Sequence, residues 1–223
     1  MTAYIFDSET TGLNDPQLVE AAWLKLGSIT GLPVSSEFLG RFKPSKAIEL
    51  GALATSHILD EELVECPPHT TFSMPEDTQY LIGHNVDYDW GVIGRPDIKR
   101  ICTAALSRRL WPEADSHSQS AMIYLHHRDQ ASSLLRNAHA ALDDVKNCRL
   151  LLAKIVDSLA EKLGRPVMDW DELWQLSEDA RIPTVISFGK HKGMEIAKLP
   201  SDYKRWLLGQ AELDPFVRKA LSR

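Results

Sequence analysis

Carboxylates occur at three places along the chain, and each place borders an apolar segment. The first is the pair Asp7 and Glu9, which follows the apolar residues 3–6. Because alternate side chains of a β-strand point to the same face, these two carboxylates are expected to lie side by side. Such a pair is unfavourable unless a cation or a proton lies between the two groups. The pair therefore indicates a metal site whose other ligands come from elsewhere in the chain.

Two further groups follow in the sequence. His84, Asn85 and Asp89 come after a short apolar segment, and His139 and Asp144 come just before a long helical pattern. Each group alone is weak evidence, because Asn and Asp favour turns, a histidine can cap a helix and an aspartate can simply be solvated. The three groups in this order, each at the edge of an apolar element, indicate one shared site.

Divalent metal chemistry explains these residue types. Mg²⁺ and Mn²⁺ prefer oxygen ligands, and two such ions about 3.5–4 Å apart promote hydrolysis of a phosphodiester. A base must also accept the proton of the attacking water. His139 and Asp144 are five residues apart, roughly 140° around a helix, so they cannot share one helical face. The spacing predicts that Asp144 lies on the helix and His139 on the loop before it, where an imidazole acts as a base near neutral pH.

Alternating and helical patterns predict an α/β protein around these groups. The first three strands are joined by short turns, which favours an antiparallel meander. Strands are expected at residues 3–7, 18–26, 37–43, 81–84 and 98–102, and helices at 48–63, from 89 onwards, at 104–110, 118–125 and 140–163.

Composition and charge indicate a globular cytoplasmic protein with two parts. The 223 residues are 43% hydrophobic, include no run long enough to span a membrane and begin without a signal-peptide pattern. The three cysteines are widely spaced, which is typical of reduced cytosolic thiols. The net charge is −6, yet residues 180–223 contain nine Lys and Arg against four Asp and Glu. We therefore expect a first domain at 1–163, a linker at 164–180 and a basic α+β module at 181–223, with a strand at 184–188 and a helix at 201–208.

The motifs resemble those of the DEDD superfamily of 3′→5′ exonucleases, in its histidine-containing branch. The resemblance covers about residues 3–160 and consists of three ordered motifs. They are D-x-E-T-T-G at Asp7, Glu9, Thr10, Thr11 and Gly12; H-N-x-x-F-D at His84, Asn85 and Asp89, with Tyr88 in place of Phe; and H-x4-D at His139 and Asp144. Asp87 and Asp143 are extra acids beside the motif positions, and the motif spacing selects Asp89 and Asp144.

This resemblance implies a ribonuclease H-like mixed sheet flanked by helices, with two divalent ions, Mg²⁺ or Mn²⁺. It implies that Asp7 bridges the ions, that Glu9 and Asp144 complete one metal site, that Asp89 supports the other, and that His139 is the general base. Thr10, Thr11, Gly12, Leu13, His84 and Asn85 are then expected to bind the terminal nucleotide. Leu13 either packs on the last base or belongs to the core.

Within the superfamily the chain resembles the exonuclease X group. The segment ICT…RRLWP at residues 101–112 and the tail motif FGKHKG at 188–193 are similar to that group. This implies a DNA exonuclease acting on single-stranded or duplex 3′ ends, expected in DNA repair, as a monomer or homodimer without membrane contact. An exoribonuclease of the ribonuclease T or oligoribonuclease kind is the alternative, since the same motifs serve both sugars. A non-catalytic nucleic-acid-binding module would have a broken set of acids, and this set is intact.

The tail offers a second nucleic-acid contact. Lys190, His191 and Lys192 form a basic turn that is expected to contact phosphates. Tyr203 and Trp206 could stack on bases, or they could form the core of a module of about 40 residues, which is small for a hydrophobic core. We expect Trp206 in the core.

Overall fold

The computed structural model describes residues 1–136 and 138–222, and the chain divides into two compact units. The first unit is Met1–Ser177 and the second is Glu178–Arg223. The first unit contains the whole β-sheet, and the regular elements described in the second are helical. The division predicted from sequence, into a catalytic domain at 1–163, a linker at 164–180 and a module at 181–223, remains a prediction.

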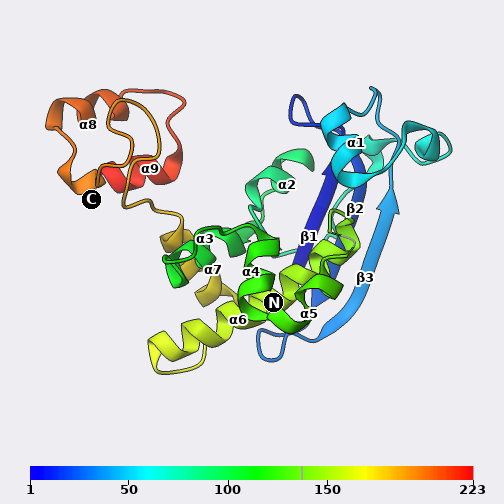
Figure 1. Ribbon diagram of the computed structural model, residues 1–223, viewed down its shortest axis with the longest axis horizontal. Coiled ribbons are helices and arrows are strands. Elements are labelled where there is room, and N and C mark those ends of the chain that lie inside the picture. The colour runs from blue at the N-terminus through cyan, green and yellow to red at the C-terminus, as the bar shows by residue number, and fades with distance from the viewer. Residues whose placement is uncertain (137, 223) are drawn as a thin grey trace. The chain divides into compact units, whose positions relative to one another are not determined.

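A five-stranded mixed sheet forms the centre of the first unit (Figure 1). Its order is β3 (Val34–Arg41), β2 (Leu18–Leu26), β1 (Ala3–Thr10), β4 (Tyr80–Gly83) and β5 (Lys99–Cys102). The first three strands form an antiparallel meander, whereas β4 and β5 run parallel to β1. The predicted meander and α/β class are therefore confirmed, with the third strand starting three residues earlier than expected.

Helices cover the sheet and explain why its central strands are so apolar. The long α6 (Ala141–Leu163) packs across β1 and β2, and α3 (Thr103–Leu110) and α4 (Gln119–His126) pack against α6. The short α5 (Arg128–Leu134), which the sequence did not predict, packs against α4. Residues Ala3 to Phe6 of β1 are at most 1% exposed. A strand buried on both faces reads as a continuous apolar run.

The predicted helix at 48–63 is interrupted, which is a correction. The structure has α1 (Leu50–Ser56), then a separate 3₁₀ turn at Asp60–Leu63. His57 ends α1 in the left-handed region, with φ of 57°, and its N–H bonds to the carbonyl of Leu53. A residue in the left-handed region cannot continue a right-handed helix. The helix therefore ends at this point, although the apolar pattern in the sequence continues.

Residues 164–180, which the sequence analysis assigned to a linker, end in α7 (Trp170–Ala180). Trp170 and Leu173 on α7 are buried, and the Ser177 hydroxyl accepts the N–H of Cys102 at 2.8 Å. No described helix is both long enough and apolar enough to cross a bilayer.

The second unit has its own small core. Six aliphatic side chains pack together: Ile186, Ile196, Leu199, Leu207, Val217 and Leu221. They come from α8 (Ser201–Leu208), α9 (Pro215–Leu221) and the segment before them. The strand predicted at 184–188 is wrong, because only a single bridge joins Val185 to Glu195. Three backbone hydrogen bonds join residues 184–186 to residues 193–196, including one from the N–H of Ile186 to the carbonyl of Met194 at 2.9 Å, and the turn between them has positive φ at Gly189 and Gly193.

Candidate active site

The end of β1 and the start of α2 (Asp87–Val92) bring three carboxylates together. Asp7 and Glu9 lie two residues apart on β1 and are partly buried. Between them, the backbone N–H and hydroxyl of Ser8 both donate to Asp89 Oδ1, at 3.0 and 2.6 Å. Asp89 is only 5% exposed. Ser8 therefore fixes the carboxylate of α2 against the strand that bears the other two.

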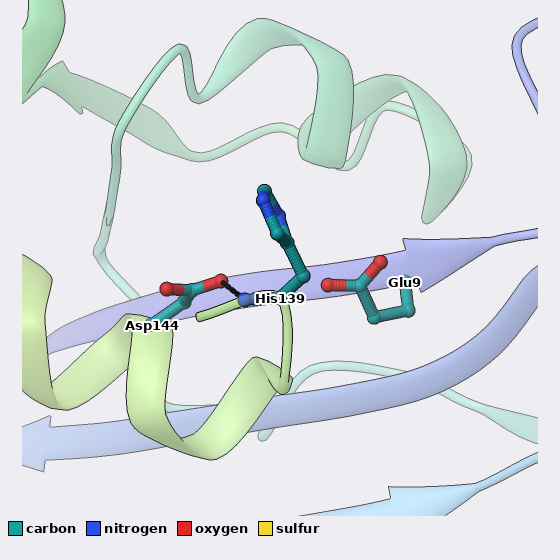
Figure 2. A group of neighbouring side chains, drawn as sticks. All are labelled: Glu9, His139 and Asp144. Atoms are coloured by element: carbon teal, nitrogen blue, oxygen red, sulfur yellow. Dashed lines mark hydrogen bonds between the residues drawn. The ribbon is translucent and has the colours of Figure 1, made fainter. Parts of the chain in front are cut away.

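The start of α6 adds Asp144 and His139 (Figure 2). His139 lies on the loop before the helix, with φ of 71°, and its backbone N–H donates to Asp144 Oδ2 at 3.0 Å. Gln119 Nε2 donates to Asp144 Oδ1 at 3.3 Å. The predicted arrangement, Asp144 on the helix and His139 before it, is thus what the structure shows. The His139 side chain is exposed and remains free of the bond that orients Asp144.

The site concentrates negative charge. Ligand atoms of Glu9, His139 and Asp144 all lie within 4.8 Å of one another. Burial, and then the neighbouring carboxylates, raise the pKa of Glu9 to about 8 and hold the pKa of Asp7 well above its usual value. Burial also raises the pKa of Asp89 to about 7 and that of Asp144 above its ordinary range. Across the described chain no Lys or Arg forms an ion pair with these four acids. Hard oxygen donors without a cationic partner fit divalent ions.

Glu20 is a fifth acid that the sequence reasoning missed. It lies directly opposite Glu9 on β2, and Arg41 lies directly opposite Glu20 on β3. Arg41 Nε donates to Glu20 Oε2 at 2.9 Å, and the N–H of Ala141 donates to Glu20 Oε1 at 3.2 Å. Glu20 therefore ties the first residue of α6, and with it the loop of His139, to the sheet. Nothing in the sequence marks it, because its role depends on cross-strand register.

A cleft of about 560 Å³ opens beside the acids. Its lining includes Glu9 of the cluster and, around it, residues of three segments: Ser8, Thr10, Gly12, Leu13, Glu49, Gly51, Ala52, Thr55, Asn85 and Tyr88. Leu13 is 81% exposed, so it is not a core residue. Gly12 has φ of 146°, and a Cβ there would lie 2.2 Å from the Glu49 carboxyl carbon. The size suits a small ligand or part of a larger one.

Other predicted contact residues are held within the protein. Thr11 is fully buried, and its hydroxyl accepts the N–H of Gln17. His84 Nε2 donates to the carbonyl of His117 at 2.8 Å, and its Nδ1 lies 3.0 Å from the Thr103 hydroxyl. Burial lowers the pKa of His84 to about 4, so the ring is neutral. Both side chains thus anchor the backbone around the cleft, and their contacts with a substrate remain a prediction.

The acids beside the motif positions lie elsewhere. Asp87 forms an ion pair with Arg100 on β5. Asp143 lines a separate cleft of about 450 Å³, together with Lys146 and Arg149. The structure therefore brings Asp89 and Asp144 to the acidic cluster and leaves their neighbours outside it.

The basic turn lies in the second unit. Lys190 and Lys192 are exposed, and the His191 ring packs on Tyr203 at 4.5 Å between centroids. The expectation that Trp206 belongs to the core is wrong, because this side chain is 56% exposed. Leu207, the next residue on α8, faces the core instead and is 1% exposed.

Comparisons with known proteins agree on the class of fold. The chain superimposes on "Exonuclease X in complex with 5′ overhanging duplex DNA" with a TM-score of 0.55 at 22% identity, covering 77% of this chain and 99% of the other. It also matches the structure of Escherichia coli exonuclease I with a dT13 oligonucleotide, with a TM-score of 0.56 at 20% identity over 73% of this chain and 42% of the other. The first unit thus has the α/β fold of these exonucleases.

The sequence comparison identifies particular relatives. The chain is 26% identical to exodeoxyribonuclease 10 of Escherichia coli strain K12 over 232 residues, covering 97% of this chain and 96% of that protein. The same protein from Escherichia coli O6:H1 matches to the same extent. No protein-family profile matches the chain. The similarity spans both units.

Proposed function

We propose that this protein is a metal-dependent 3′→5′ exodeoxyribonuclease that releases 5′-nucleoside monophosphates one at a time. The observation that carries this proposal is the convergence of Asp7, Glu9, Asp89 and Asp144, without a cationic partner among the described residues, beside an open cleft. The nearly full-length similarity to exodeoxyribonuclease 10 supports DNA as the substrate.

The residues divide the work of phosphodiester hydrolysis. Asp7, Glu9, Asp89 and Asp144 would hold two divalent ions, Mg²⁺ or Mn²⁺. Ions bound there would supply activation of a water and stabilisation of the leaving oxygen. His139, exposed on its loop close to Glu9 and Asp144, would accept the proton of the attacking water, because imidazole is the side chain most often used as a general base.

The cleft receives the terminal nucleotide. Leu13 packs against the last base, and the backbone at Gly12 lets the chain approach it closely. Asn85, exposed and with φ of 71°, lies on the same wall. We further infer that the protein takes part in DNA repair, and that it works in the cytoplasm, where thiols such as its three cysteines remain reduced.

The test is digestion of 5′-labelled DNA and RNA oligonucleotides, single-stranded and duplex, with Mg²⁺ or with EDTA. We expect a ladder that shortens from the DNA 3′ end, requires metal and is lost in Asp144→Asn. Asp143→Asn, an adjacent acid outside the cluster, is the matched control and should digest normally. Faster loss of RNA would make the protein an exoribonuclease, and equal loss of activity in both variants would contradict the assigned site.

A further inference from the structure

The second unit has aromatic side chains beside its core: Tyr203 packs against the core, whereas Trp206 lies outside it and is largely exposed. Trp206 stacks on Tyr203 with 5.4 Å between ring centroids and an angle of 28°, and Tyr203 packs edge-on against His191. The six aliphatic residues of the core pack without Trp206, which stays 56% exposed. A small unit has few apolar side chains with which to build a core. A tryptophan that stays exposed in such a unit therefore indicates a role outside the core.

Basic residues are neighbours of these aromatic residues in the sequence and are exposed. Lys190 and Lys192 flank His191 in the turn, and Arg205 precedes Trp206 on α8. Over the part of the chain that the structure describes, none of these three cations forms an ion pair. Of the nearby acids, Glu195 is paired with Lys198 at 2.8 Å, and Asp202 lies in the first turn of α8.

The turn is held close to the rings by its backbone. Gly189 has φ of 69°, and a Cβ there would lie 2.5 Å from the Tyr203 hydroxyl oxygen. The N–H of Lys192 bonds to the carbonyl of Gly189, and the N–H of Gly193 bonds to that of Ile186. The lysines therefore project from a closed turn beside Tyr203.

We propose that Trp206, Tyr203 and His191, with Lys190, Lys192 and Arg205, form a second binding site for single-stranded nucleic acid. Phosphates contact the cations and a base stacks on Trp206, as in strand-binding proteins that combine positive charge with aromatic platforms. This inference rests on the proposed function for its ligand class. It adds a contact that does not require a 3′ end, so the protein can hold a strand between successive cleavages.

The test uses the full chain carrying Asp144→Asn, so that the ligand is not consumed, and a covalently closed single-stranded DNA circle with an internal fluorescent label. A circle offers no 3′ end, so its binding, followed by fluorescence anisotropy, reports on a site other than the cleft. Trp206→Ala should weaken binding by about 5- to 150-fold, the range for loss of one stacked base. Trp206→Phe should retain most of the affinity, and Tyr124→Ala, an exposed aromatic residue of the first unit, should bind like the parent.

Salt dependence tests the cations separately. The double variant Lys190→Ala and Lys192→Ala should reduce the slope of log K against log salt by about 1.4, because each phosphate contact to a single strand contributes about 0.7. Lys219→Ala on α9 should leave the slope unchanged. Equal affinity of the parent and Trp206→Ala for DNA and RNA circles would overturn the proposal. Absence of metal-dependent digestion of linear DNA by the protein with Asp144 intact, together with normal binding of the circle, would overturn the proposed function alone.

Discussion

At the scale of single residues, the backbone of His139 binds Asp144, while its side chain is the general base that we propose. Its backbone orients Asp144, while its side chain is exposed and projects from the loop. His139→Ala should keep the backbone bond and lose the base, so we expect kcat to fall by about 10²- to 10⁴-fold, with KM little changed. Steady-state digestion measures both constants. His69→Ala, outside the site, is the control, and an unchanged kcat in His139→Ala would contradict the assignment.

The raised pKa values of the acids predict a pH-dependent response to metal. The pKa of Glu9 rises from 4.5 to about 8 on folding. Between these pH values the folded protein therefore binds more protons than the unfolded chain. The stability of the metal-free protein must then fall as pH rises through this window. Bound cations relieve that repulsion, so the increase in Tm with Mg²⁺ over EDTA should be larger at pH 8 than at pH 6. Equal increases in thermal melts at the two pH values would contradict this account.

At the scale of elements, a row of side chains across three strands holds the site. Glu9, Glu20 and Arg41 lie opposite one another on β1, β2 and β3, and Glu20 also binds the start of α6. Glu20→Ala removes an acceptor of two hydrogen bonds, so we expect the free energy of unfolding to fall by about 1–3 kcal/mol. The rate of digestion should fall by more than the fraction of unfolded protein accounts for, because the loop of His139 is no longer held by Glu20.

Denaturant unfolding and metal titration check this prediction. Because Glu20 positions α6, Glu20→Ala should also weaken Mg²⁺ binding at a temperature where the variant is fully folded. Glu37→Ala, an exposed acid on β3, should change neither quantity. If folded Glu20→Ala binds Mg²⁺ with normal affinity, Glu20 stabilises the fold but does not position the metal ligands.

Local patterns allowed much of the architecture to be predicted from sequence. Alternation and turn residues predicted the meander, and the five-residue spacing of His139 and Asp144 predicted loop and helix. What escaped prediction depends on contacts between distant segments, such as the register of Glu9 with Glu20 and the bond from Ser8 to Asp89. The exposure of Trp206 escaped for a related reason, because periodicity does not tell which of two adjacent apolar residues on α8 faces the core.

At the scale of the whole molecule, the two units have separate cores, which predicts separable stability. Leu207 is 1% exposed in the second core, so Leu207→Ala should destabilise that unit by about 2–5 kcal/mol. The Mg²⁺-dependent unfolding transition, which belongs to the first unit, should keep its midpoint in scanning calorimetry. Leu152→Ala in α6 should give the reverse pattern, and a single transition that shifts in both variants would show that the units unfold together.

The long sequence separation of the contacts that build the site affects when the site can form during synthesis of the chain. The bond between Ser8 and Asp89 joins residues 81 positions apart, and the bond between Glu20 and Ala141 joins residues 121 apart. Closing such long loops costs conformational entropy, which only the contacts formed afterwards offset. The local meander is therefore expected to form before the acids come together. A chain still emerging from the ribosome carries Asp7 and Glu9 from the outset but lacks Asp144 until the start of α6 has been made. The hydrolytic centre therefore forms only after most of the first unit has been made, and a nascent chain that ends before Asp144 lacks one of the four acids.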